Sequence, residues 1–270
     1  MSALPLLLEP AELAARLQQP MLLIVDLCKE SVYQQAHVPG AIWLNCRQLM
    51  LGQLPSPGRL PVLEQLNTLF GSLGLTPDAH VVVYDDEGGG WAGRFIWTLD
   101  MIGHRHYSYL NGGLHAWLAD GLPIENTPNK PHPTTVSLTV HPEADVDADY
   151  LIAHHADGHH AVWDARSPDE YSGARVLAQR AGHIPGAVNY EWTCAIDRDN
   201  SMRIRPLETV RLELARLGIT ADKIVITHCQ THHRSGFTYL LGRILGFPQM
   251  KAYAGSWSEW GNRSDTPIAR

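Results

Sequence analysis

The sequence predicts an α/β protein made of two tandem copies of one unit, each copy a mainly parallel sheet flanked by helices. The first observation is an internal repeat: IVDLCKESVY, AHVPGA and VVVYDDEGGGWAG are followed in the same order by AVWDARSPDEY, GHIPGA and IVITHCQTHHRSG. The second is that short β-branched runs alternate with amphipathic stretches in both copies, a pattern typical of βα units. Landmarks repeated in one order indicate a tandem duplication.

The elements of each copy follow from the apolar pattern. In the first copy, β-branched runs predict strands at Leu22–Asp26 and Val81–Tyr84, and Pro61–Leu73 carries apolar residues at helical spacing. A proline suited to a first helical turn opens the helix predicted in the second copy. The elements predicted there are strands at Ala161–Asp164 and Ile224–Thr227 and a helix over Pro206–Leu217.

The join between the copies is predicted in a proline-rich stretch. Five prolines fall between positions 122 and 149, which is linker composition. We therefore predict one domain over residues 10–123, a linker over 124–148 and a second domain over 149–270. Within the linker, the alternating TTVSLTV segment is compatible with one short strand.

Length, charge and cysteine content narrow the class of protein. The chain has 270 residues and a formal net charge of −7. An acidic chain lacks the basic surface that binds phosphates, so we expect no nucleic-acid partner. No apolar run reaches the roughly 18 residues that span a bilayer, so we expect no membrane partner. The four cysteines form no CxxC pair, which argues against a structural zinc site and favours reduced thiols in the cytoplasm. We expect a monomer.

One cysteine stands where chemistry is expected in such a sheet. Cys229 follows the strand IVITH, and a helix is predicted to begin around Ser235. Ligands of open α/β sheets bind at the carboxyl ends of the strands, where loop N–H groups and a helix N-terminus favour an anion. The charge of Arg234 and the helix dipole are predicted to lower the thiol pKa below its free value of about 8.5. A buried structural cysteine is the alternative.

Four segments in order, DARSPDEY, GHIPGAVNYEW, VITHCQTHHRSG and YAGSWSEW, resemble the rhodanese family of sulfurtransferases in its tandem two-domain form. The similarity covers roughly residues 10–265. It implies two rhodanese-like domains, a catalytic one over 149–270 and an inactive one over 10–123. The nucleophile of the family opens a six-residue loop, which here is Cys229–Arg234. Asp86 takes the matching place in the first copy, and a carboxylate cannot attack sulfur.

The resemblance also implies a reaction. The CQTHHRS loop is similar to that of a bacterial rhodanese subtype that transfers sulfur from thiosulfate to cyanide. A sulfane sulfur would then pass from thiosulfate, or a related donor, to cyanide or a thiol through a persulfide on Cys229. The expected partners are a small sulfur donor and acceptor, and a protein thiol is a further acceptor. Neither a metal nor an organic cofactor is implied.

The substrate-binding residues are expected in and beside this loop. Arg234 attracts the anionic donor or, alternatively, only ties the loop to a neighbouring carboxylate such as Glu170. Trp192 has no counterpart in the first copy, and it either walls the pocket near Cys229 or fills a cleft between the domains. The predicted set is Gln230, Thr231, His232, His233, Arg234 and Trp192.

Two other functions share the same thiol. A persulfide carrier would hand sulfur to a protein partner and also needs Cys229. A Cys-dependent phosphatase or arsenate reductase would use Cys229 and Arg234 to bind an oxyanion. Phosphatases of that type place the arginine six residues after the cysteine, whereas here it stands five after. The smaller ring is expected to exclude a tetrahedral phosphate.

Several other motifs receive structural interpretations. The pairs His154-His155 and His159-His160 are adjacent in sequence, so their side chains diverge and predict no metal set. His37 and His183 occur in both copies and are expected to bond backbone groups near the Pro-Gly turns, with Asp26 and Asp164 as strand-end caps. The GxGxxG at Gly88, Gly90 and Gly93 is interpreted as a loop of the inactive copy.

Overall fold

The computed structural model describes residues 4–270, and the chain divides into two compact units. Each unit includes one short segment from the other half of the chain. The first unit comprises residues up to Leu49, Pro61–His141 and Ile196–Ile204, and the second comprises Met50–Leu60, Pro142–Ala195 and Arg205–Arg270. The units are therefore not continuous in sequence, unlike the predicted domain ranges.

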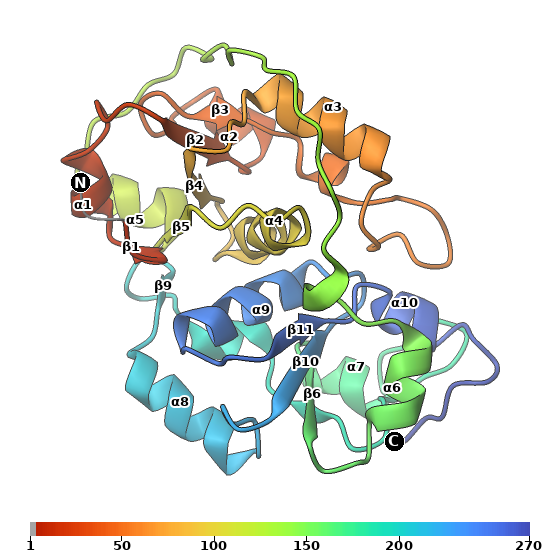
Figure 1. Cartoon of the computed structure of the whole chain (residues 1–270). Helices are drawn as coiled ribbons and strands as arrows, with labels where there is room; N and C mark the ends of the chain where they lie inside the picture. The colour runs from red at the N-terminus through yellow and green to blue at the C-terminus, as the bar shows by residue number, and fades with distance from the viewer. Residues whose placement is uncertain (1–3) are drawn as a thin grey trace. The chain divides into compact units, whose positions relative to one another are not determined.

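The first unit is built on a parallel five-stranded sheet in the order β1-β5-β4-β2-β3 (Figure 1). Its strands are β1 (Leu7–Leu8), β2 (Leu22–Asp26), β3 (Ile42–Trp43), β4 (His80–Tyr84) and β5 (Tyr107–Leu110). Its helices are α1 (Pro10–Ala14), α2 (Glu30–Tyr33), α3 (Leu63–Leu73), α4 (Gly90–Met101) and α5 (Gly113–Ala119). A short antiparallel pair, β8 (Ile196–Asp197) with β9 (Arg203–Ile204), also belongs to this unit.

The second unit has a parallel four-stranded sheet in the order β11-β10-β6-β7. Its strands are β6 (His160–Asp164), β7 (Val188–Asn189), β10 (Ile224–His228) and β11 (Met250–Ala252). Its helices are α6 (Ala148–His154), α7 (Pro168–Ser172), α8 (Leu207–Arg216), α9 (Arg234–Ile244) and α10 (Ser256–Trp260). Helix α9 packs against β10 and against the edge strand β11 (Figure 1).

The α/β class and the parallel sheets are confirmed, and so are the four predicted strands, three of them one residue longer at one end. Three details differ from the prediction. The helix predicted over Pro61–Leu73 begins two residues later, at Leu63. Pro206 stands at the N-cap of α8, just before its first turn. The TTVSLTV segment forms no strand: its first threonine, Thr134, instead donates its N–H to Gly71 at the end of α3 and its hydroxyl to Leu75.

The duplication is visible in matching local networks. The ring of His37 stacks on Tyr33, and its Nδ1 lies 2.7 Å from the Tyr33 carbonyl. The ring of His183 stacks on Tyr171 in the same way, with Nδ1 2.9 Å from that carbonyl. The structural role predicted for both histidines is confirmed.

The strand-end aspartates also play the same part in both copies. Asp26 accepts a hydrogen bond from the N–H of Cys28, and Asp164 accepts one from the N–H of Arg166. Each carboxylate thus caps the turn that leaves its strand, as predicted.

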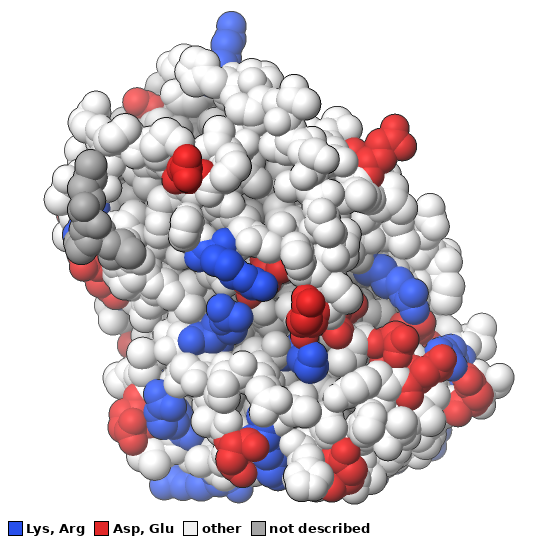
Figure 2. All heavy atoms as spheres, viewed as in Figure 1, with Lys and Arg blue, Asp and Glu red and all other residues white. Residues whose placement is uncertain are grey.

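The described residues include no helix long and apolar enough to cross a membrane. On the face drawn in Figure 2, most basic side chains lie close to acidic ones.

Candidate functional site

Cys229 lies at the centre of the second sheet, directly after β10. Strand β10 pairs with β6 on one side and β11 on the other. The chain then turns through the five residues 229–233, and α9 begins at Arg234 with His233 as its N-cap. The helix therefore starts one residue earlier than predicted. Because of this turn, the thiol is buried, with 1% of the residue exposed.

The loop stabilises the thiolate form of Cys229. Burial raises the pKa of the thiol. The charge of Arg234 and hydrogen bonds from Ser235 and from the Thr231 backbone lower it, and together they outweigh burial, so the net shift of the pKa is downward. Buried His232 adopts a positive φ of 56° and places Nδ1 2.7 Å from the Ser235 hydroxyl. The predicted direction of the thiol pKa is confirmed, and Ser235 adds a group that the sequence had suggested only as a helix cap.

Arg234 makes a bidentate ion pair within the same unit. Its Nη1 and Nη2 atoms lie 2.6 and 2.8 Å from the two carboxylate oxygens of Glu170, whose side chain is 2% exposed. Burial raises the pKa of Glu170, yet the guanidinium lowers it to about 2. The alternative named for Arg234, a tie to Glu170, is thus present, and the charge of Arg234 still acts on Cys229.

Two other predicted residues, Trp192 and Gln230, make contacts in and beside the loop. Trp192 lies beside the loop, with its ring centroid 5.9 Å from that of His233 and 6.0 Å from that of Phe237. Gln230 donates its side-chain amide to the Leu177 carbonyl, in the insertion that only the second copy carries. Five of the six predicted residues form the loop itself, and Trp192 contacts it through His233; a role of these residues in substrate binding stays a prediction.

The sequence analysis missed that His228 lies against the buried ion pair of Asp164 and Arg166. His228 precedes Cys229, and its Nε2 lies 3.6 Å from Asp164 Oδ2. Burial lowers the pKa of His228 to about 4. Asp164 is also held by the guanidinium of Arg166, which lies 4.3 Å above the Trp257 ring. The sequence Asp164-Ala165-Arg166, which places two opposite charges at the end of a central strand, is the signal from which this group could have been inferred.

A second missed feature is the segment Met50–Leu60, which packs in the second unit. A Cβ on Gly58 would lie 2.2 Å from the Thr231 carbonyl oxygen, so only glycine fits against the Cys229 loop there. The next residue, Arg59, forms an ion pair with Glu259 of α10. No local sequence pattern predicts these two contacts, because the residues that make them are far apart in sequence.

The first copy has a matching loop that holds a carboxylate in place of the thiolate. The prediction that Asp86 matches Cys229 was wrong. Tyr84 faces Asp26 as His228 faces Asp164, so Asp85, rather than Asp86, is the counterpart of Cys229. The Asp85 carboxylate accepts three backbone N–H groups, from Glu87, Gly89 and Ala92, at 2.8 to 3.1 Å.

The two loops differ in the cation that accompanies the anion. Gly90 opens α4 as Arg234 opens α9. Burial and the charge of Glu87 raise the pKa of Asp85 to about 6, whereas the pKa of Cys229 is lowered. Both copies therefore form a loop around an anionic side chain, and the second adds a thiol and a positive charge.

Comparison with known proteins gives one consistent picture. A thiosulfate sulfurtransferase from Azotobacter vinelandii is 54% identical over 267 residues, covering 99% of this chain and 98% of that protein. A second, from Pseudomonas aeruginosa, is 53% identical with the same coverage, and the sulfur carrier protein TtuD from Thermus thermophilus is 30% identical over 94% of this chain and 93% of its own length.

A solved structure is similar in fold. The anaerobic ergothioneine biosynthesis enzyme from Chlorobium limicola superposes with a TM-score of 0.85 at 20% identity, covering 97% of this chain and 69% of that one. The family model for the rhodanese-like domain matches twice, at residues 9–120 and 147–263. The chain therefore belongs to the rhodanese family, with two rhodanese-like domains in tandem.

Proposed function

We propose that this chain is a thiosulfate sulfurtransferase that moves a sulfane sulfur to cyanide or to a thiol through a persulfide on Cys229. The observation that carries the proposal is a cysteine with a lowered pKa in a loop whose N–H groups converge on the sulfur. The two relatives above 50% identity bear the name of this activity. We also propose that residues 149–270 carry the catalysis and that residues 10–123 carry none.

The reaction has two half-steps. In the first, the Cys229 thiolate attacks the outer sulfur of thiosulfate, the sulfur–sulfur bond of the donor breaks, and sulfite leaves with the electron pair. In the second, cyanide attacks the outer sulfur of the persulfide, thiocyanate leaves, and the thiolate is regenerated. The loop N–H groups stabilise the negative charge in both states, and the kinetics are ping-pong.

A persulfide carrier is the second candidate. The relative from Thermus thermophilus is named a sulfur carrier protein, and the same Cys229 persulfide would serve that role. Turnover with free cyanide supports the enzyme, whereas transfer restricted to a protein thiol supports the carrier. The phosphatase alternative has less support, because both terminal guanidinium nitrogens of Arg234 are already paired with Glu170. A cytoplasmic location and a monomeric state stay predictions.

Intact-mass measurement tests the proposal directly. After thiosulfate treatment the wild-type chain should gain one sulfur atom, about 32 Da, and lose it on addition of cyanide. The Cys229→Ser variant should gain none, because serine cannot hold a sulfane sulfur. Cys194→Ser is the matched control, since Cys194 is exposed in the same unit. A mass gain that persists in Cys229→Ser and vanishes in Cys194→Ser would assign the reaction to Cys194 and contradict the proposal.

A further inference from the structure

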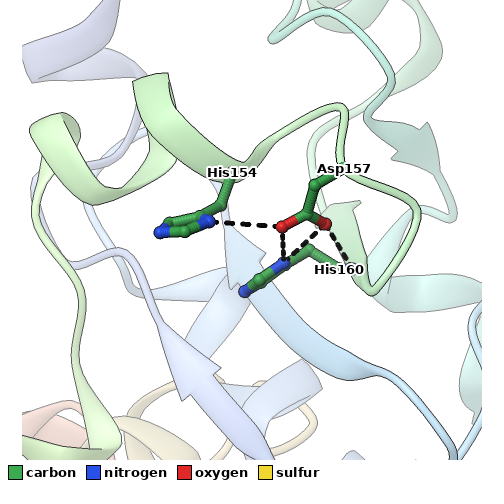
Figure 3. Close-up of side chains that lie close together, drawn as sticks. All are labelled: His154, Asp157 and His160. Atoms are coloured by element: carbon green, nitrogen blue, oxygen red, sulfur yellow. Dashed lines mark hydrogen bonds and ion pairs between the residues drawn. The ribbon is translucent and has the colours of Figure 1, made fainter.

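A second group of chemically active side chains lies at the other end of strand β6 from the catalytic loop. His154 ends α6, Asp157 lies in the following turn, and His160 begins β6 (Figure 3). Strand β6 runs parallel to β10, so its last residue, Asp164, lies beside the strand end that leads to Cys229. The group is therefore separated from the catalytic loop by the length of the strand.

The three side chains converge on one point. His160 Nδ1 lies 2.8 and 2.9 Å from the two carboxylate oxygens of Asp157, and His154 Nδ1 lies 3.2 Å from Asp157 Oδ2. One nitrogen or oxygen atom of each residue lies within 4.8 Å of the other two. Both imidazole rings direct a nitrogen at the carboxylate (Figure 3).

These separations are close to those of a tetrahedral metal site. Zinc binds histidine nitrogen at about 2.0–2.1 Å and carboxylate oxygen at about 2.0–2.2 Å, so two such ligands lie roughly 3.3 Å apart. The two imidazole–carboxylate separations at Oδ2, 2.9 and 3.2 Å, nearly match this spacing. One imidazole nitrogen of His154 lies within 4.8 Å of one of His160. A rotation of the His154 side chain, which is 41% exposed at the helix end, brings these two nitrogens to the metal-site spacing.

Neighbouring groups orient the ligands. The other carboxylate oxygen, Oδ1 of Asp157, accepts the backbone N–H groups of His159 and His160 at 2.9 and 3.2 Å, which leaves Oδ2 directed at the imidazoles. Tyr150 Oη lies 2.8 Å from His160 Nε2. A metal-bound histidine commonly donates its other N–H to such a group. With an ion on Nδ1, the ring proton of His160 lies on Nε2, where Tyr150 accepts it.

We propose that His154, Asp157 and His160 form a binding site for a divalent ion of the cobalt-to-zinc series, with water at the remaining position. Two imidazoles and one carboxylate are ligands that suit these borderline ions. An ion here ties the end of α6 to the start of β6 and stabilises the fold, without contact with Cys229. The adjacent histidine pairs predicted no metal set; the structure instead combines one member of each pair.

Calorimetric titration of the full chain with Zn²⁺ tests the site. We expect one equivalent bound, at least a thirtyfold loss of affinity in His154→Ala, and a similar loss in Asp157→Asn. The matched control is His159→Ala, which removes the exposed histidine next to His160 and should leave the affinity unchanged. Tyr150→Phe should weaken binding by roughly tenfold, because it removes only the group that orients His160. Unchanged affinity in both His154→Ala and Asp157→Asn overturns the proposal.

Co²⁺ distinguishes this site from the cysteines. Bound by imidazole and carboxylate, cobalt should show visible d–d bands without a sulfur-to-metal charge-transfer band in the near ultraviolet. A charge-transfer band would place the ion on a thiolate and overturn the proposal. Zn²⁺ should also raise the melting temperature of the wild-type chain but not of His154→Ala. All these variants keep Cys229, so sulfur transfer tests the proposed function independently.

Discussion

At the residue scale, Arg234 joins two roles that the sequence left as alternatives. Its hydrogen bonds go to Glu170, yet its charge lowers the pKa of Cys229. Both are possible because a guanidinium presents several donors in a fixed plane, while its charge acts over a few ångströms without contact. Donor recruitment by Arg234 stays a prediction, since the paired carboxylate offsets part of its charge.

Replacing Arg234 with alanine should affect stability and reactivity together. The change leaves Glu170 buried without its partner, which should lower the free energy of unfolding by on the order of 3 kcal/mol. It should also raise the pKa of Cys229, since an opposite charge nearby favours the thiolate. Denaturant unfolding measures the first effect, and the pH dependence of thiol alkylation measures the second.

The double variant Glu170→Gln with Arg234→Ala separates the two effects. A neutral amide needs no counter-charge, so the double variant should recover part of the stability. The thiol pKa should stay raised, because the guanidinium is still missing. A thiol pKa equal to that of the wild type in both variants would show that Arg234 does not act on Cys229.

The same pair makes stability depend on pH. The pKa of Glu170 is about 2 in the folded chain, below its ordinary value of 4.5. A lowered carboxyl pKa contributes stability above pH 4.5, which is lost as the pH falls toward 2. The melting temperature of the wild type should therefore fall more steeply over this range than that of Glu170→Gln. Parallel curves for the two proteins would contradict this assignment.

At the element scale, the turn between β10 and α9 sets which anion fits. The six-residue loop Cys229–Arg234 directly follows the strand, and its last residue is the first residue of the helix. Wild-type protein should hydrolyse aryl phosphates negligibly, because this ring is too small for a tetrahedral phosphate. Inserting one glycine before Arg234 should enlarge the ring, so that phosphate hydrolysis becomes detectable while sulfur transfer falls. Robust wild-type phosphatase activity that disappears in Cys229→Ser would favour the phosphatase alternative.

We predict that one glycine of the segment Met50–Leu60 affects the position of the Cys229 loop. A methyl group on Gly58 meets the Thr231 carbonyl, so Gly58→Ala should displace the loop and reduce sulfur transfer by roughly tenfold or more. Gly52→Ala is the control in the same segment. Gly52 has a φ of 72° and open space around it, so its replacement should cost about 1 kcal/mol of stability while activity is retained. Equal loss of activity in both variants would show that Gly58 acts only through stability.

The elements that sequence predicts well are those that local pattern determines. Strands β2, β4, β6 and β10 are runs of β-branched and apolar residues with a charged or polar end, and all four lie where predicted. The contact of Gly58 with Thr231 and the combination of His154 with His160 depend on the folded chain. The register of the first-copy loop was misplaced by one residue because DDEGGG offers two adjacent aspartates and no side chain that fixes the alignment.

At the scale of the whole molecule, the two copies show what the fold supplies and what the second copy adds. Both have the stacked histidine and tyrosine, the capping aspartate and a loop that surrounds an anion. Only the second copy places a thiol in the loop and an arginine at the start of the helix. The geometry that surrounds the anionic side chain therefore belongs to the duplicated unit, and we predict that sulfur transfer depends on these two positions of the second copy.

This comparison predicts that Asp85 has a structural role in its own unit. Asp85→Ala removes the acceptor of three backbone N–H groups, so it should lower the free energy of unfolding by about 2–3 kcal/mol. Asp86→Ala is the matched control and should have little effect. Persulfide formation on Cys229, measured by intact mass on the folded fraction, should be unchanged in both, because the second loop keeps all of its own groups. If Asp86→Ala were the destabilising change, the alignment of Asp86 with Cys229 would be correct and the register derived from the strand pairing would be wrong.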